Sequence, residues 1–98
     1  MDTYMMLVLL TGRGVQNIKG SPSRVDTAKE VFRDLGAEIK DIYLLMGRYD
    51  MAFVVQAPNY ETVAKAAIVL DSLGSMRTET FRAFTEKEYQ KIIAETPR

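Results

Sequence analysis

Two runs of hydrophobic residues without polar alternation stand out along the chain. Residues 4–10 are apolar throughout and are followed by Thr11 and Gly12, and residues 51–57 are interrupted only by Gln56. A strand with one face in water alternates polar and apolar side chains, whereas a continuously apolar strand is covered on both faces. The pattern therefore predicts that residues 4–11 and 51–57 are the central strands of a sheet.

Helical spacing of apolar residues predicts a first helix over residues 21–35. Its apolar positions recur every three or four residues. We expect Ser21 to cap this helix, Pro22 to lie in its first turn and Gly36 to end it. The preceding residues, 12–20, contain three glycines, and we expect a loop there.

A second helix is predicted over residues 60–73, with Asn59 as its cap and Gly74 as its end. Its central turns carry a single charged side chain, Lys65. A helix that is apolar around most of its circumference is expected to be buried on more than one side.

The remaining pattern adds an edge strand, a final strand and a C-terminal helix. Residues 37–46 are polar in their first half and are joined to 51–57 by a short turn, which is typical of a hairpin whose edge strand is protected by charge. Residues 75–84 alternate between two faces, as a strand does. Thr85 and Glu88 have the spacing of a capping box at the start of a helix.

The order of elements is therefore strand, helix, hairpin, helix, strand and helix. With right-handed crossovers, this order gives the ferredoxin-like βαββαβ arrangement of the α+β class. We expect a four-stranded antiparallel sheet with two helices on one face and an extra C-terminal helix, all within a single domain of residues 1–98.

The sheet face that the helices leave bare is predicted to be apolar. The first strand has apolar side chains on both of its faces, and residues 51–57 have apolar side chains on both faces except at Gln56. An apolar patch of this size is rarely exposed on a monomer. We therefore expect a second copy of the chain to pack its sheet against this one, giving an isologous homodimer or a higher oligomer.

Composition excludes several kinds of site and partner. The 98 residues include 13 basic and 13 acidic side chains, so no net charge attracts nucleic acid or an anionic membrane. Cysteine and histidine are absent, which removes disulfides, the usual zinc ligands and cysteine or histidine catalysis. We expect no metal and no bound cofactor.

The apolar run at residues 4–10 is not expected to associate with a membrane. It is too short to cross a bilayer, and no basic residue precedes it, as a signal peptide would require. We therefore expect a cytoplasmic protein.

Three side chains in the predicted hairpin turn, Arg48, Tyr49 and Asp50, form the first candidate site. As functional groups, they offer an anion-binding guanidinium and two hydrogen-bonding or acid–base groups. As structural groups, Asp50 would cap the turn while Gly47 takes a positive φ, and this is the more ordinary role of such residues.

Arg77 and Glu79 are two residues apart on the last predicted strand, so they share a face. In a cavity, the pair could bind a polar ligand or position a proton. At a contact between subunits, the same pair would set the register of the two copies. Both interpretations remain open.

The glycine-rich segment before the first helix is the last candidate site. It carries Arg13 and Lys19, with Arg24 just beyond it, and such a segment could hold an anion. It lacks the spacing of a P-loop or of a dinucleotide-binding motif, and a connecting loop is the plainer interpretation. We include Asn17 and Lys19 among the candidate ligand-binding residues.

Three segments of the chain resemble the GYD domain family, which is named for a glycine-tyrosine-aspartate signature. They are Gly47-Arg48-Tyr49-Asp50, then Arg77-Thr78-Glu79-Thr80 with Phe81-Arg82-Ala83-Phe84, and the opening segment Gly14-Val15-Gln16-Asn17-Ile18-Lys19 with Ser21-Pro22. The segments occur in the expected order and span nearly the whole chain.

The resemblance implies a dimeric α/β barrel and says little about activity. Our first hypothesis is a homo-oligomeric small-molecule-binding or accessory domain. The alternative is a cofactor-independent enzyme, similar to an isomerase or a monooxygenase, that acts on a small metabolite such as an aromatic one. This enzyme would use Tyr49, Asp50, Arg77 and Glu79. A closed polar pocket containing a carboxylate or tyrosine of shifted pKa would favour the enzyme.

Overall fold

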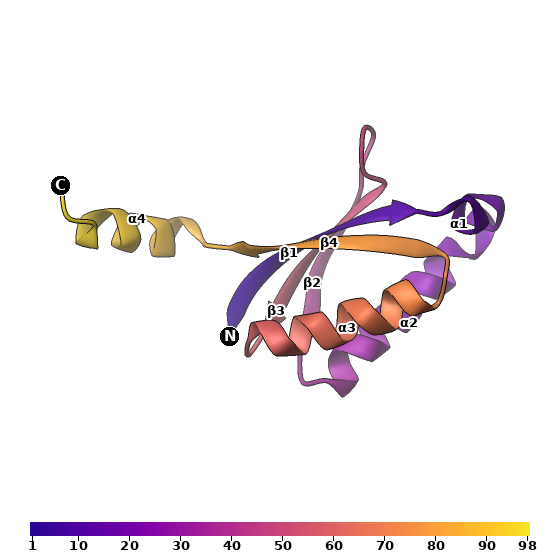
Figure 1. Cartoon of the computed structure of the whole chain (residues 1–98), viewed down its shortest axis with the longest axis horizontal. Helices are drawn as coiled ribbons and strands as arrows, with labels where there is room; N and C mark the ends of the chain where they lie inside the picture. The colour runs from indigo at the N-terminus through magenta and orange to yellow at the C-terminus, as the bar shows by residue number, and fades with distance from the viewer.

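A four-stranded antiparallel sheet, with two long helices on one of its faces, makes up the body of the molecule (Figure 1). The computed structural model describes all of residues 1–98. The strands are β1 (Asp2–Leu10), β2 (Glu38–Leu44), β3 (Met51–Ala57) and β4 (Met76–Ala83). The helical segments are α1 (Gly12–Gln16), the 3₁₀ turn η1 (Ile18–Gly20), α2 (Ser21–Asp34), α3 (Tyr60–Ser72) and α4 (Glu86–Glu95).

The strand order is β2-β3-β1-β4, which confirms the predicted ferredoxin-like topology. The two continuously apolar strands are central, and the two strands that carry charge lie at the edges. In β2, the pairing with β3 shifts between Ile39 and Asp41. A charged edge strand with such an irregularity is a poor template for edge-to-edge pairing.

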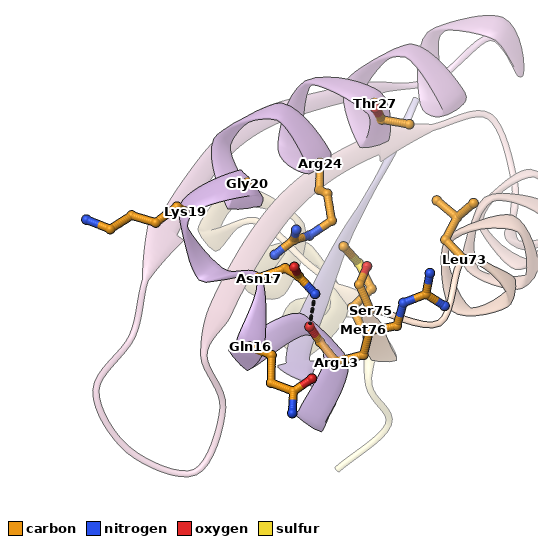
Figure 2. A pocket seen from close by; sticks show the side chains of 10 residues that line it. All are labelled: Arg13, Gln16, Asn17, Lys19, Gly20, Arg24, Thr27, Leu73, Ser75 and Met76. Atoms are coloured by element: carbon orange, nitrogen blue, oxygen red, sulfur yellow. Dashed lines mark hydrogen bonds between the residues drawn. The ribbon is translucent and has the colours of Figure 1, made fainter.

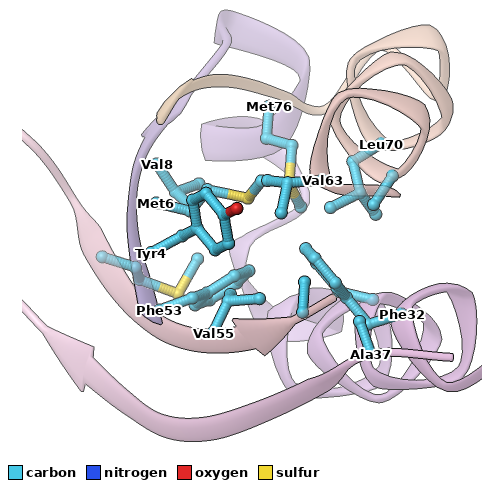
Figure 3. Close-up of a cluster of buried hydrophobic side chains, with 14 residues drawn as sticks. Tyr4, Met6, Val8, Phe32, Ala37, Phe53, Val55, Val63, Leu70 and Met76 are labelled. Atoms are coloured by element: carbon cyan, nitrogen blue, oxygen red, sulfur yellow. The ribbon is translucent and has the colours of Figure 1, made fainter. Parts of the chain in front are cut away.

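The hydrophobic core lies between the sheet and the helices α2 and α3 (Figure 3). Alternate residues of β1 and β3 face the helices. The largest fully buried side chains are Tyr4, Met6, Val8, Phe32, Phe53, Val55, Val63, Leu70 and Met76. Burying one side chain of this size is worth about 1.5–3 kcal/mol relative to leaving it in water, so this layer is the main source of stability within one chain.

Three of the predicted helix ends are confirmed. The side chain of Asn59 accepts the backbone N–H of Thr62 at 2.9 Å, so it caps α3. Gly36 and Gly74 follow α2 and α3 with φ angles of +81° and +86°, a region that side chains disfavour.

Residues 12–16 and 18–20 are helical, with a turn at Asn17 between them, so the predicted loop is wrong. Thr11 caps α1, because its hydroxyl oxygen accepts the backbone N–H of Gly14 at 3.2 Å. The turn η1 then runs directly into α2. Gly20 therefore occupies the cap position of α2, and the prediction that Ser21 caps this helix is also wrong.

Helix α3 buries only one side in the single chain. Val63, Ala66 and Leu70 face the core, whereas Ile68 and Val69 are 69% and 41% exposed. The single chain does not supply the predicted burial on more than one side, because no other element of the chain covers the outer side of α3. No helix in the structure combines the length and the apolar character that a bilayer-spanning segment needs.

Helix α4 extends beyond the end of β4, away from the rest of the molecule (Figure 1). The radius of gyration is consequently 14.8 Å, against about 13 Å for a compact chain of this length. The predicted capping box is confirmed: Thr85 and Glu88 each accept the other's backbone N–H. The N–H of Thr85 lowers the pKa of the Glu88 carboxyl below its usual value, so this cap persists at neutral pH and is lost as the pH falls through that lowered pKa.

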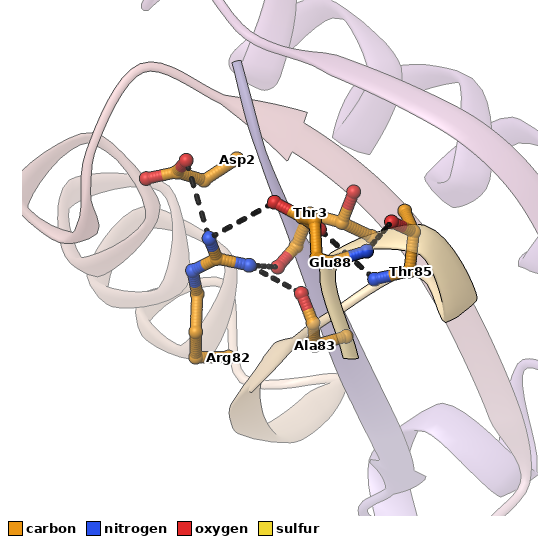
Figure 4. Close-up of polar contacts among 6 residues, drawn as sticks. All are labelled: Asp2, Thr3, Arg82, Ala83, Thr85 and Glu88. Atoms are coloured by element: carbon orange, nitrogen blue, oxygen red, sulfur yellow. Dashed lines mark hydrogen bonds and ion pairs between the residues drawn. The ribbon is translucent and has the colours of Figure 1, made fainter. Parts of the chain in front are cut away.

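Arg82 joins the start of β1 to the end of β4 and to α4 (Figure 4). Its guanidinium group donates to the carbonyl oxygens of Thr3 and Ala83, forms ion pairs with Asp2 and Glu88 at 3.2 and 3.8 Å, and lies over the rings of Tyr4 and Phe84. The Arg82 side chain is only 19% exposed, so these contacts are partly shielded from water and salt.

Helix α1 packs against the connection between α3 and β4 through Gly14. A Cβ atom at this position would lie 2.1 Å from the carbonyl oxygen of Ser75. That oxygen also accepts the backbone N–H of Thr11 at 3.1 Å, and the Thr11 hydroxyl donates to the carbonyl oxygen of Gly74 at 2.7 Å. A side chain at position 14 would therefore displace backbone.

The substitution Gly14→Ala is expected to lower the free energy of unfolding by about 1–3 kcal/mol, because the added methyl overpacks this contact. Gly12→Ala is the matched control in the same helix, since a Cβ at position 12 meets nothing within 4 Å and alanine favours a helix. Urea unfolding followed by circular dichroism measures both variants. Equal losses in the two would contradict the close approach.

Candidate functional site

Asp50 attaches the β2–β3 hairpin to the end of β1. Its Oδ2 atom accepts the backbone N–H of Leu10 at 2.8 Å, and its own N–H donates to the carbonyl oxygen of Val8 at 2.8 Å. Gly47 has a φ of +143°, as predicted for the turn. The Asp50 carboxylate therefore reaches across to the neighbouring strand, whereas we expected it to cap its own turn.

The fold brings Tyr49 and Glu79 together from positions 30 residues apart. The hydroxyl of Tyr49 donates a hydrogen bond to Oε2 of Glu79 at 2.5 Å, and the guanidinium of Arg48 lies 5.9 Å from the centre of the Tyr49 ring. The bond to Glu79, reinforced by desolvation and by the charge of that carboxylate, raises the pKa of Tyr49 above its usual value. Tyr49 is therefore a neutral hydrogen-bond donor at neutral pH.

Arg77 lies on the same sheet face as Glu79 but is not paired with it. The two residues stand opposite Leu9 and Leu7 of β1, as the alternation of the strand requires. The structure contains three ion pairs, and Arg77 takes part in none of them. Its exposed guanidinium is free to meet a group from outside the chain.

The sheet face opposite α2 and α3, called the outer face below, is apolar at its centre. Two rows of residues cross all four strands: Tyr43, Ala52, Leu7 and Glu79 form the first row, and Asp41, Val54, Met5 and Phe81 form the second. The side chains of Tyr43 and Phe81, at opposite edges, are 55% and 46% exposed. The hairpin between β2 and β3 rises on this side, away from the helices (Figure 1).

A cavity of about 720 Å³ lies among α1, η1, the first turns of α2 and the α3–β4 connection (Figure 2). Its lining residues are Arg13, Gln16, Asn17, Lys19, Gly20, Arg24, Thr27, Leu73, Ser75 and Met76. The candidates Asn17 and Lys19 therefore lie together in its wall, and Figure 2 shows the Lys19 side chain extending outward from it. No acidic side chain lines this cavity, and none of the hairpin candidates reaches it.

Hydrogen bonds hold the wall of this cavity in place. The Asn17 side chain donates from Nδ2 to the carbonyl oxygen of Arg13 at 2.9 Å. Arg24 donates from Nη2 to the carbonyl oxygen of Gly14 at 3.2 Å. The segment that we expected to be a connecting loop is thus a hydrogen-bonded wall. Elsewhere in the structure, no three acidic side chains converge closely enough to hold a metal ion.

Sequence reasoning missed two residues that the structure makes prominent. Ser75 is 7% exposed in the cavity, and nothing in the sequence marks it beyond its position directly after Gly74. Arg82 had a visible signal, because it lies between Phe81 and Phe84, and arginine commonly stacks on aromatic rings.

Replacing Glu79 with glutamine is expected to lower the pKa of Tyr49, because the neutral amide is a weaker acceptor and repels no phenolate. In the wild-type chain, the raised pKa of Tyr49 means that the bond to Glu79 stabilises the fold below the pKa of an unfolded tyrosine. That contribution is lost as the pH rises through the folded pKa. A carbon NMR titration of the Tyr49 ring measures the shift. Glu86→Gln on α4 is the control and should leave the titration unchanged; an unchanged titration in Glu79→Gln would show that the bond is absent.

Comparisons with known proteins place the chain in a family. The family model of the GYD domain matches residues 4–93. A Thermus thermophilus protein named glutamine synthetase and cystathionine beta-lyase binding protein is 36% identical over 84 residues, which cover 85% of this chain and 88% of that protein. The crystal structure of TTHA0845 from Thermus thermophilus matches with a TM-score of 0.57 and 25% identity, covering 87% of this chain and 95% of that one. The resemblance drawn from the sequence is confirmed: this chain belongs to the GYD domain family.

Proposed function

We propose that this chain is a non-catalytic accessory protein that pairs with a second copy of itself through the outer face and binds a metabolic enzyme. The apolar centre of the outer face, which none of the helices covers, is the observation that carries the proposal. Exposed apolar patches of this kind mark association surfaces on soluble proteins.

The outer face suits a second copy better than it suits water. Its centre is formed by Met5, Leu7, Ala52 and Val54. Each row of the face has an aromatic ring at one edge and a carboxylate at the other. Arg77 on the same face and Arg48 beside the Tyr49 ring carry charge opposite to that of Asp41 and Glu79. Two such faces can meet without net repulsion, and their sheets would form the dimeric α/β barrel.

The projecting helix α4 gives a second reason for self-association. A helix of ten residues is marginal in water on its own. Its apolar side chains Tyr89, Ile92 and Ile93 are 56%, 43% and 57% exposed. Phe81 on the outer face is 46% exposed, and Phe84, beside Arg82 at the start of the connection to α4, is 53% exposed. A second copy that covers the outer face would therefore also offer α4 a surface to pack on.

Binding to an enzyme is supported by the name of the relative from Thermus thermophilus, which describes it as binding glutamine synthetase and cystathionine beta-lyase. The shared length and identity make the same two enzymes the first partners to test for this chain. In this proposal the chain acts by binding, and the chemistry belongs to the enzyme.

Catalysis by the chain itself has one observation in its favour, the hydrogen-bonded pair of Tyr49 and Glu79. The raised pKa of Tyr49 makes it a poor base at neutral pH. The Asp50 carboxylate accepts the backbone N–H of Leu10, and the only acid–base candidates in the cavity wall are cationic. The geometry therefore favours binding over a cofactor-independent isomerase or monooxygenase.

Light scattering is expected to give a mass of at least twice the 11.1 kDa of one chain. Leu7→Asp should shift the protein to the monomer, because association would bury an unpaired charge. Ile93→Asp on the exposed side of α4 should weaken association without touching the core. Ile68→Asp is the matched control, since Ile68 is 69% exposed on α3 and lies away from the outer face. A wild-type monomer at micromolar concentration refutes the assembly.

Purified glutamine synthetase and cystathionine beta-lyase from the same organism are the direct test of the partner. Biolayer interferometry is expected to detect at least one of them binding with a dissociation constant of about 1 μM or below, as for a specific complex. Lys65→Gln, an exposed change on α3, serves as the folded control. Absence of binding to both enzymes at tenfold higher concentration would reject this partner class.

A further inference from the structure

Two buried polar side-chain atoms in the structure have no hydrogen-bond partner: Nε of Arg24 and Oγ of Ser75. Both residues line the cavity among α1, η1, α2 and the α3–β4 connection. We propose that this cavity binds the phosphate group of a small phosphorylated metabolite, held by Arg13, Arg24 and Ser75, with Lys19 at the rim. This site is independent of the outer face and goes beyond the proposed function.

The unpaired atoms are the strongest argument that this cavity binds a ligand. Native proteins pair nearly all their buried polar atoms, so each exception calls for an explanation. Ser75 is only 7% exposed, and its backbone oxygen already accepts the backbone N–H of Thr11. A serine hydroxyl can donate one hydrogen bond, and Ser75 lines the cavity, where a ligand could supply the acceptor.

The charge of the cavity specifies an anion. Arg13, Lys19 and Arg24 are three of its ten lining residues, and no aspartate or glutamate lies among the other seven. None of these three cations takes part in an ion pair of the structure. Cations gathered in one concave site without counter-charges repel one another, and an anion would remove that repulsion.

Backbone geometry leaves room for the two guanidinium groups. A Cβ atom at Gly20 would lie 3.0 Å from Nη1 of Arg24, and one at Gly74 would lie 3.4 Å from Nη1 of Arg13. The Nη2 atom of Arg24 donates to the carbonyl oxygen of Gly14, and this bond orients the guanidinium group. The Nε atom of Arg24 has no partner within the protein. In the view of Figure 2, Ser75 lies between the two guanidinium groups.

Phosphate fits this arrangement better than a single carboxylate does. One arginine can satisfy a carboxylate through two parallel hydrogen bonds, whereas a phosphate has more oxygens and up to two charges to share between two arginines and a hydroxyl. The volume of about 720 Å³ exceeds what one phosphate needs and falls in the range of small-molecule sites. Leu73 and Met76 supply an apolar side for an organic group.

Calorimetric titration of the full-length chain with pyrophosphate, at fixed ionic strength, is the test. We expect binding at least tenfold tighter than that of the tricarboxylate citrate, because citrate matches the charge but not the tetrahedral geometry. Equal binding of the two anions, or no binding of pyrophosphate at millimolar concentration, overturns the phosphate site.

Ser75→Ala is the sharpest variant. Because the Ser75 hydroxyl has no hydrogen-bond partner within the protein, its replacement by alanine removes no stabilising bond. The urea midpoint without ligand should therefore stay the same or rise. Affinity for pyrophosphate should fall about tenfold, as for a lost hydrogen bond to a charged group. A fall in the urea midpoint with unchanged affinity would instead give Ser75 a structural role and overturn its place in the site.

The arginines are tested by Arg13→Gln and by Arg24→Lys, which keeps the charge but loses the planar fork. Each should weaken pyrophosphate binding about tenfold, whereas Lys65→Gln, with a similar charge loss on the exposed side of α3, should not. Wild-type affinity in both arginine variants overturns the proposal. Ile93→Asp should bind pyrophosphate normally, so a failure of self-association leaves this test intact.

Discussion

Two helices can cover one face of a four-stranded sheet, and this limit shapes the rest of the molecule. On the helical side, alternate residues of β1 and β3 close a core with α2 and α3. On the other side, the same strands carry Met5, Leu7 and Val54, and no helix covers this face. Helix α4 at the C-terminus likewise carries exposed apolar side chains. Folding uses one face of these two strands, and the proposed association would use the other.

The topology could be predicted because the apolar pattern depends on position in the sheet. Apolar residues on both faces are typical of central strands, so the continuous apolar runs of β1 and β3 predict their central position. Gly36 and Gly74 mark helix ends because their φ angles favour glycine. Helix α1 could not be predicted, since glycine disfavours a helix. It forms because Gly14 lets its backbone reach Ser75, and that contact is made only in the folded chain.

The sequence predicted the individual candidate residues, but not which of them lie together in the folded chain. Alternation along β4 places Arg77 and Glu79 on one face, but it does not reveal that Tyr49 reaches Glu79 from the hairpin. Asn17 and Lys19 belong to a cavity whose other wall includes Ser75, more than fifty residues later in the chain. Single residues can be read from local pattern, whereas their partners depend on strand order and on where helices end.

Arg82 has a consequence for the geometry of any assembly. Its guanidinium ties the first strand, the last strand and the base of α4 into one junction. Arg82 therefore acts with the capping box of Thr85 and Glu88 in setting the direction in which α4 leaves the body. Without Arg82, the arm would swing about the residues after β4, and copies joined through it would lose a common orientation. In the proposed self-association, the same sheet would then give assemblies of mixed shape.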